Sequence, residues 1–315
     1  VQDQVRYLEL IEYPLMKKYT GEIALLFNTL IWGGTFALIK NAFNDISPLL
    51  FLGLRFSIAA LIFLPFVYAS LKKTNKQTLI AGSILGFFYF AGFTAQSLGL
   101  NLTTATKSGF ITGTFVVFIP ILQLIIEKRK PKWFNILSVL LVLIGLILLS
   151  SKGENALDFI QQLGSDFNLG DLLTLLCALL FAFQVVYVDV FTKKYDYMPM
   201  VFVQLLITGV GGFVLSYIFS IASLETVKFT FNATVVTAIF YTAIFASIIA
   251  TVIQLKFQKF VSPTKAGIIF SIEPIFAAIF AYFLLSEKIS NFGFIGCVLI
   301  FAGVIVSEVF SSKDE

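Results

Sequence analysis

The sequence predicts an all-α membrane protein of ten transmembrane helices, arranged as two inverted five-helix repeats around a central cavity. Three observations support this prediction: an apolar composition, ten long apolar runs and an internal repeat. Of the 315 residues, 58% are hydrophobic and 13% are charged, and the mean hydropathy is +0.93. A water-soluble domain of this length has too little interior to bury so much apolar surface, whereas a bilayer covers it from outside.

Ten apolar runs are each about 20 residues long, which is enough to cross the hydrocarbon core as a helix. They lack an alternation of apolar and polar residues, and they are about twice the length of a barrel strand. Helices are therefore favoured over an outer-membrane barrel. The predicted spans are 23–43, 48–71, 79–100, 108–126, 133–151, 172–192, 198–222, 233–255, 264–286 and 292–310.

Lysine and arginine collect in alternate loops, and this predicts the orientation of the bundle. Short positively charged loops stay on the cytoplasmic side of a membrane, and the densest cluster is the four cations between Lys128 and Lys132. A cytoplasmic N-terminus puts this cluster and the other lysine-rich loops on that side. With ten spans both termini are then cytoplasmic, and we expect a multi-pass protein of the cytoplasmic (inner) membrane.

The chain divides into four segments. Residues 1–15 precede Met16 and are assigned to an N-terminal extension or an expression remnant. Residues 16–151 form a first five-helix unit, an acidic external loop follows at 152–171, and residues 172–315 form a second unit. The loop is a boundary between repeats and not between independently folding domains.

Self-comparison of the chain reveals the repeat. Thr106-Lys107-Ser108-Gly109 recurs 158 residues later as Thr264-Lys265-Ala266-Gly267, and 47–51 resembles 198–202 at an offset of 151. Each unit has an odd number of spans, so the second would lie upside down relative to the first. A two-fold pseudo-axis in the membrane plane would then place equivalent helices around a shared midplane cavity.

Several motifs resemble those of the EamA-type branch of the drug/metabolite transporter superfamily. They occur in the family's order over almost everything after Met16. The matching stretches are Trp32-Gly33-Gly34-Thr35-Phe36, Ser47-Pro48 followed by Leu54-Arg55-Phe56, Pro120 with Glu127-Lys128, Glu273-Pro274 with Ser286-Glu287-Lys288, and Gly296 with Gly303. The resemblance implies secondary transport, often efflux, of amino acids or other small metabolites.

Four charged residues fall inside the predicted spans. Lys40 and Asp189 lie near helix ends, where their side chains can reach the interface, and Lys193 is placed to pair with Asp189. Arg55 lies about 10 Å inside its helix and needs a carboxylate, backbone carbonyls or water. It is either a structural group or a site for a substrate carboxylate.

Glu273 lies near the bilayer centre, where an ionised carboxylate is costly, so we expect it to line the cavity as a proton-coupling or substrate-amine site. Pro274 cannot donate a backbone hydrogen bond to the Phe270 carbonyl and should kink the helix. The alternative is a protonated Glu273 that only bonds a neighbouring helix.

Uncharged polar and aromatic residues near mid-span complete the candidate site. Gln96 and Gln254 have the repeat offset of 158 and are expected to face the cavity from equivalent positions. Amide side chains inside a bundle more often form hydrogen bonds between helices, and this is the expected role of the other mid-span amides, Asn28, Gln123, Gln184 and Gln204. Aromatic walls are expected from Trp32, Tyr89, Tyr187 and Tyr241 and would suit an amphipathic organic solute.

Several classes of chemistry find no support in the sequence. There is no histidine, Cys177 and Cys297 lie singly in apolar runs, and no phosphate-binding loop occurs. We therefore expect no catalytic residue, metal, cofactor or nucleic-acid partner, only a small-molecule substrate and the lipid bilayer. The spacings Gly82-x-x-x-Gly86 and Gly109-x-x-x-Gly113 allow close helix packing within one bundle or in a homodimer.

Three functional classes remain open at this point. The first is an exporter of amino acids or related metabolites that works by alternating access, with proton coupling as an option. The second is a membrane-embedded enzyme acting on a lipid-linked substrate, which lacks a visible acid–base pair. The third is a passive channel, which lacks a charged ring or carbonyl filter signature. Saturable counterflow in liposomes would separate them.

The positive cluster after the fourth span generates a topological prediction. A Lys130→Cys variant should be protected from an impermeant thiol reagent added outside intact cells, because the surrounding cations hold this loop in the cytoplasm. Reaction from outside would reverse the predicted orientation.

Overall fold

The computed structural model describes residues 19–150, 167–285 and 290–311. Within these ranges ten helices are long and apolar enough to cross a membrane, which confirms the predicted number of spans. The N-terminal segment at 1–15, Met16, most of the connecting loop and the Ser286-Glu287-Lys288 motif lie outside the described residues.

The first unit contains five spans, two of which are interrupted. The helices are α2 (Thr20–Gly33) with α3 (Thr35–Ala42), α4 (Pro48–Leu71), α5 (Lys76–Leu102), α6 (Ala105–Gly113) with α7 (Phe115–Glu127), and α8 (Trp133–Ser150).

The second unit also contains five spans. They are α10 (Leu169–Thr192), α11 (Tyr197–Ile221), the composite span α12 (Ala233–Tyr241), η1 (Thr242–Ile249), α13 (Ala250–Phe257) and η2 (Gln258–Phe260), the interrupted α14 (Pro263–Phe270) with α15 (Glu273–Leu285), and α16 (Asn291–Ser311). Segment η1 is a π-helix, and η2 is a 3₁₀ turn.

Polar caps fix where several helices begin. Asn75 and Asn232 each accept a hydrogen bond from the backbone amide three residues on, which satisfies one of the free amides of the first turn. Asn168 and Asp171 form a reciprocal capping box at the start of α10. This box starts the helix at Leu169, so the predicted loop at 152–171 extends too far: its last three residues are helical.

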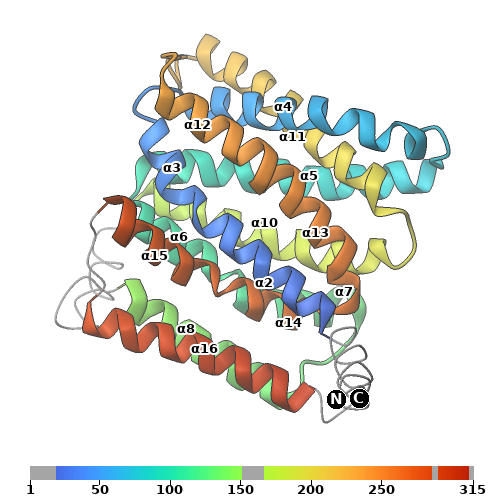
Figure 1. Ribbon diagram of the computed structural model, residues 1–315, viewed down its shortest axis with the longest axis vertical. Coiled ribbons are helices and arrows are strands. Elements are labelled where there is room, and N and C mark those ends of the chain that lie inside the picture. The colour runs from blue at the N-terminus through green and yellow to red at the C-terminus, as the bar shows by residue number, and fades with distance from the viewer. Residues whose placement is uncertain (1–18, 151–166, 286–289, 312–315) are drawn as a thin grey trace, which may run out of the picture.

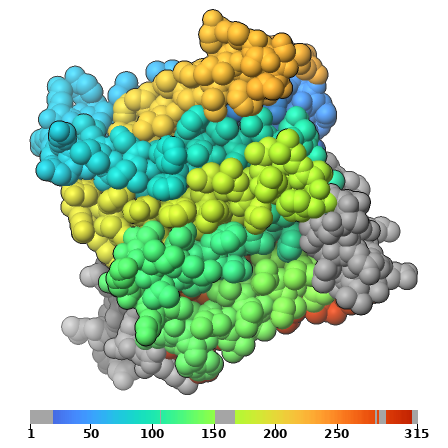
Figure 2. Space-filling model, turned by 180° about the vertical axis from the view of Figure 1, so that it is seen from behind, coloured from blue at the N-terminus to red at the C-terminus, as the bar shows by residue number. Residues whose placement is uncertain are grey.

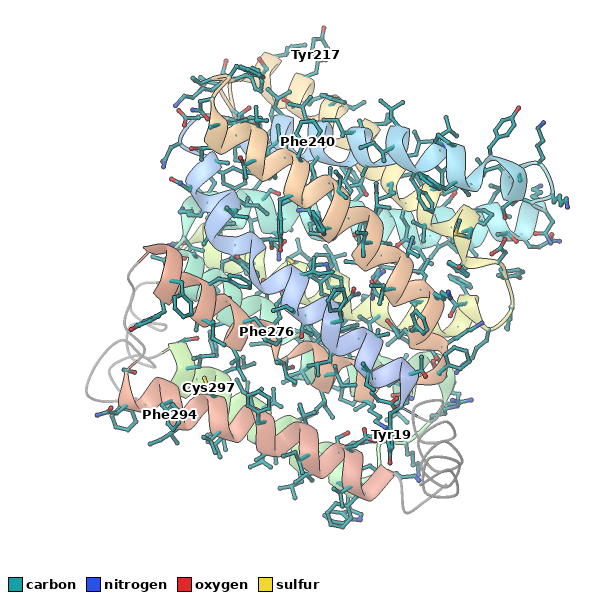
Figure 3. All side chains as sticks on the ribbon, viewed as in Figure 1. Tyr19, Tyr217, Phe240, Phe276, Phe294 and Cys297 are labelled. Carbon is teal, nitrogen blue, oxygen red and sulfur yellow. The ribbon has the colours of Figure 1, made fainter. Side chains whose placement is uncertain are left out.

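The spans pack into a layered bundle. In Figure 1, α8 and α16 lie side by side along one end of the long axis, and α4, α11 and α12 lie at the other, with α2 crossing the front between them. Seen from behind, α5, α10, the fourth span (α6 with α7) and α8 follow one another down a continuous surface (Figure 2). Each span runs across the long axis, from one side of the bundle to the opposite side. We call these two sides the Tyr19 end and the Phe294 end after the residues labelled in Figure 3.

The main contacts between two spans each have a counterpart between the equivalent spans of the other unit. The third span, α5, packs on the sixth, α10, and correspondingly the composite eighth span packs on α2 in the first. The fourth span packs on α10, as the ninth packs on α2 and α3. The second and seventh spans, α4 and α11, pack on each other, as do α8 and α16. This pattern supports the predicted two-fold relation between the units.

Close approach of α8 and α16 depends on two glycines. A Cβ on Gly296 would lie 2.5 Å from the Gly145 carbonyl oxygen, and a Cβ on Gly145 would lie 2.7 Å from the Gly296 carbonyl oxygen. Backbone atoms cannot move aside as the end of a flexible side chain can. Small residues at such contacts allow van der Waals packing to hold helices together in lipid, where no hydrophobic force acts between them.

The glycine contact predicts that Gly296→Ala lowers the thermal unfolding temperature of the detergent-purified protein. Overpacking of this kind costs about 1–3 kcal/mol. Gly109→Ala is the matched control, because a Cβ there meets no atom within 4 Å, and alanine is favoured over glycine in a helix by roughly 0.5–1 kcal/mol. Equal unfolding temperatures for the two variants would contradict the packing assigned to α8 and α16.

Candidate functional site

A cavity lies among the first, second, third, fourth, sixth, eighth and ninth spans, and its empty space, including the part open to solvent, is about 610 Å³. Both units contribute to its wall, as expected for a site at the interface of two repeats. The lining residues are Trp32, Thr35, Phe36, Arg55, Tyr89, Phe93, Gln96, Thr112, Phe115, Phe181, Gln184, Val185, Gln254, Phe270 and Glu273.

All three interrupted spans break at this cavity. The first span breaks at Gly34, beside the lining residues Trp32 and Thr35, and the fourth breaks at Thr114. The ninth breaks between Phe270 and Glu273, both of which line the cavity, so the helix is interrupted where Pro274 was expected to kink it. Irregular backbone is tolerated at membrane depth where it is enclosed by protein or lines a cavity.

Hydroxyl side chains bond to backbone carbonyls at the breaks. The Thr35 hydroxyl donates to the Trp32 carbonyl at 2.8 Å, and the Thr114 hydroxyl donates to the Ile111 carbonyl at 2.6 Å. Such bonds compensate for backbone pairing that an uninterrupted helix would supply.

The π-helix η1 and the start of α13 supply a second set of polar contacts. A π-helix shifts the backbone register and makes carbonyls available to other donors. The Trp32 indole donates to the Ala246 carbonyl at 3.2 Å, and the Asn28 amide donates to the Ala250 carbonyl at 2.8 Å. The Ser247 hydroxyl accepts a hydrogen bond from Arg55 Nε at 2.9 Å. These contacts fix the first and second spans against the eighth.

Arg55 is held by aromatic faces and one hydroxyl. Its guanidinium carbon lies 4.6 Å from the ring centroid of Phe56 and 4.9 Å from that of Phe93. Only 3% of the residue is exposed, and none of the ion pairs found among the described residues includes it. Stacking on rings stabilises the cation while leaving donors of the guanidinium available to an anion.

Glu273 contributes a carboxyl group to the same cavity. It is the first residue of α15, where the helix dipole favours a negative charge. The ion pairs of the described residues do not include Glu273 either. Trp32 and Phe270 meet edge to face nearby, with ring centroids 5.3 Å apart. The cavity therefore combines a carboxyl group, a guanidinium cation and aromatic walls. No ion pair among the described residues joins the carboxyl group of Glu273 to the guanidinium of Arg55.

A glutamine network supports the cavity wall. Gln254 donates to Gln184 and to Gln258, each at 3.1 Å, and Gln184 donates to Gln204 at 3.3 Å. Gln184 and Gln254 line the cavity, whereas Gln204 and Gln258 are fully buried behind them. The network fixes the orientation of Gln184 and Gln254 in the cavity wall.

Six of the eight side chains predicted to face the cavity lie in its wall: Glu273, Arg55, Trp32, Gln96, Gln254 and Tyr89. Tyr187 is not among the lining residues in the described part of the chain, and its ring stacks on that of Phe191 with the centroids 5.5 Å apart. The Tyr89 hydroxyl is within 2.8 Å of the Thr251 hydroxyl. Tyr241 is not among the lining residues in the described part of the chain, and its hydroxyl donates to the Ile31 carbonyl at 3.0 Å.

The other charged residues inside the spans lie away from the cavity wall. Lys40 donates to the carbonyls of Leu100, Asn101 and Thr103 at the end of α5, and Lys193 pairs with Asp189 at 2.6 Å, as predicted.

The sequence prediction missed several lining residues. Phe93 lies between Tyr89 and Gln96 at helical spacing, so all three share one face of α5 and could have been grouped. Gln184 was assigned to helix packing, and it both packs and lines the cavity. Thr112 and Phe115 flank a break for which the apolar run gives no signal.

Comparisons with known proteins match almost the whole described chain. A family model described as the EamA-like transporter family matches twice, at residues 19–151 and 168–308. The chain belongs to the EamA-like transporter family. The two matches coincide with the two five-helix units, so the repeat predicted from short motifs is also a repeat of the family model.

Relatives of this EamA-like chain are named as transporters. An "Uncharacterized transporter" of Archaeoglobus fulgidus is 33% identical over 92% of this chain and 86% of its own length. "Uncharacterized transporter YoaV" of Bacillus subtilis is 23% identical over 91% of this chain and 96% of its own length. One crystal structure has the same fold, with a TM-score of 0.74 at 16% identity, covering 94% of this chain and 99% of the other. The EamA-like chain is therefore a multi-pass membrane transporter.

Proposed function

We propose that this transporter exports amphipathic amino acids or closely related metabolites across the cytoplasmic membrane by alternating access. The observation that carries the proposal is a single cavity holding the guanidinium of Arg55 and the carboxyl of Glu273, neither in an ion pair with another described residue. A zwitterion offers a carboxylate to the first and an ammonium to the second. Bidentate binding of a carboxylate suits the planar guanidinium.

The remaining wall favours a solute with an apolar side chain. Phe36, Phe93, Phe115, Phe181 and Phe270 surround the polar groups. Aromatic rings bury large areas of a ligand without leaving polar groups unsatisfied. A substrate with a zwitterionic end and an apolar end would therefore meet matching surfaces in the cavity.

The lysine-rich loops support cytoplasmic termini and placement in the inner membrane. We propose export as the direction because the family resemblance implies efflux. Glu273 serves in this proposal as the proton-coupling group, because a carboxyl at membrane depth can exchange a proton for the ammonium of the substrate when the cavity changes sides.

The role of Arg55 predicts that Arg55→Lys weakens substrate binding and leaves the protein folded. Lysine keeps the charge and loses the bidentate geometry. A charge-assisted hydrogen bond contributes roughly 1.5–3 kcal/mol, so the apparent KM should rise about tenfold or more. The measurement is counterflow in proteoliposomes of the amino acid that most raises the thermal stability of the wild type in a screen. Lys194→Arg, an exchange between basic residues at an exposed position, is the control.

A lower folding yield for Arg55→Lys, with normal counterflow by the protein that survives, would assign Arg55 a structural role. A new chemical product in the liposomes would show an enzyme, and flux without exchange acceleration would show a channel.

The role of Glu273 predicts that Glu273→Gln abolishes the response of transport to an imposed pH gradient. Glutamine keeps the size and hydrogen bonding of the side chain and cannot titrate. Asp45→Asn is the control, because Asp45 lies in the loop between α3 and α4 and accepts a hydrogen bond from Asn232. Gradient-driven transport by Glu273→Gln at the wild-type rate would overturn the coupling role. If exchange without a gradient also persists unchanged, Glu273 does not bind the substrate.

A further inference from the structure

An ion pair joins three spans at the Phe294 end of the bundle. Lys107 Nζ lies 2.6 Å from Asp171 Oδ2, and the other oxygen of Asp171 accepts from the Thr103 hydroxyl at 2.7 Å. The side chain of Asp171 is fully buried, and that of Lys107 is 16% exposed. The contact links the start of α6 to the end of α5 and to the start of α10.

A second ion pair joins three spans at the Tyr19 end. Lys265 Nζ lies 2.8 Å from Glu22 Oε1 and 2.8 Å from Glu308 Oε2. The exposed fractions of the side chains are 12% for Lys265 and 18% for Glu22. This contact links the start of α14 to the start of α2 and to the end of α16.

The two ion pairs occupy equivalent positions in the repeat. Lys107 and Lys265 are 158 residues apart, and each donates its backbone amide to a hydroxyl N-cap, Thr104 and Ser262, which have the same separation. Asp171 and Glu22 are each the third residue of the first helix of their unit. The same arrangement of lysine and carboxylate is therefore built once at each end.

Each lysine is the third residue of a half-helix that ends at the cavity. Helix α6 runs from the Lys107 contact to Thr112, and α14 runs from the Lys265 contact to Phe270. Both half-helices stop at the breaks that line the cavity. A half-helix can tilt about such a break without disturbing the other half of its span.

We propose that Lys107–Asp171 and Lys265–Glu22 are the two gates of the cavity, one for each side of the membrane. The proposal rests on transport by alternating access and not on the identity of the substrate. With an end closed, its lysine is mostly shielded from water and must be paired. Opening the end hydrates both partners, so the pair stabilises the closed end yet separates at moderate cost once water enters.

The test is the accessibility of a cavity cysteine from each side of the membrane, without substrate. Thr35→Cys serves as the reporter in a Cys177→Ala, Cys297→Ala background, and an impermeant thiol reagent is applied to intact cells or to inside-out vesicles. A coupling that shifts a two-state equilibrium changes populations about 5- to 150-fold. Lys107→Met should raise the labelling rate at least about fivefold from one side only, and Lys265→Met should raise it similarly from the other side only.

Two controls separate gating from loss of charge. Lys193→Met breaks the Lys193–Asp189 ion pair, which has the same 2.6 Å length as Lys107–Asp171 but does not join different spans. This variant should leave labelling unchanged from both sides. Lys107→Arg and Lys265→Arg keep the charge and should stay near the parent rate. If a methionine variant does not accumulate, Thr103→Val or Glu308→Gln removes one contact of the corresponding gate and should shift labelling in the same direction by less.

Labelling that rises from the same side in both variants, or that does not change in either, would overturn the proposal. Fast labelling of the parent from both sides at once would indicate a channel and contradict alternating access itself. Side-specific labelling combined with failed Arg55 and Glu273 predictions would retain the gates and reject the substrate class.

Discussion

The hydrogen bonding of backbone amides within the membrane is the constraint on which this structure depends. Water cannot satisfy them there, so a chain that leaves helical geometry must do so inside protein or beside a cavity. The first, fourth and ninth spans all break at one cavity, and the π-helical segment of the eighth span bonds Trp32. The polar character of the site therefore comes from interrupted backbone as well as from side chains.

The same constraint distinguishes two cations inside the spans, Lys40 and the buried Arg55. Lys40 has three backbone carbonyls around its ammonium group, at 2.7, 3.2 and 2.9 Å, so its hydrogen bonds are already made and its role is to hold the end of α5. Arg55 has one hydroxyl and two aromatic faces. Aromatic faces stabilise a cation without occupying its N–H donors. Of these two charges inside the spans, Arg55 is thus the one suited to a ligand.

The sequence predicted the ten spans because hydropathy depends only on local composition, and the second span, 48–71, agrees at both ends. Of the breaks, only the one beside Pro274 had a local cause that could be recognised. Those at Gly34 and Thr114 depend on neighbouring spans that enclose the freed groups. Tyr241 illustrates the limit for side chains: mid-span depth was predictable, but the bond to the Ile31 carbonyl was not, since that partner lies 210 residues away. The Lys107–Asp171 pair likewise required helix packing.

Duplication explains why the two ends resemble each other, and later divergence explains why they are not identical. At the Phe294 end the carboxylate of Asp171 also belongs to a capping box, so one residue both starts α10 and holds Lys107. At the Tyr19 end Lys265 is shared by Glu22 and Glu308, and the neighbouring Thr264 donates to Gln123 at 2.6 Å. A second carboxylate and an added hydrogen bond change the cost of separating the helices there. Substitution at a few partner positions can thus make two equivalent ends unequal, while the packing of the repeats is preserved.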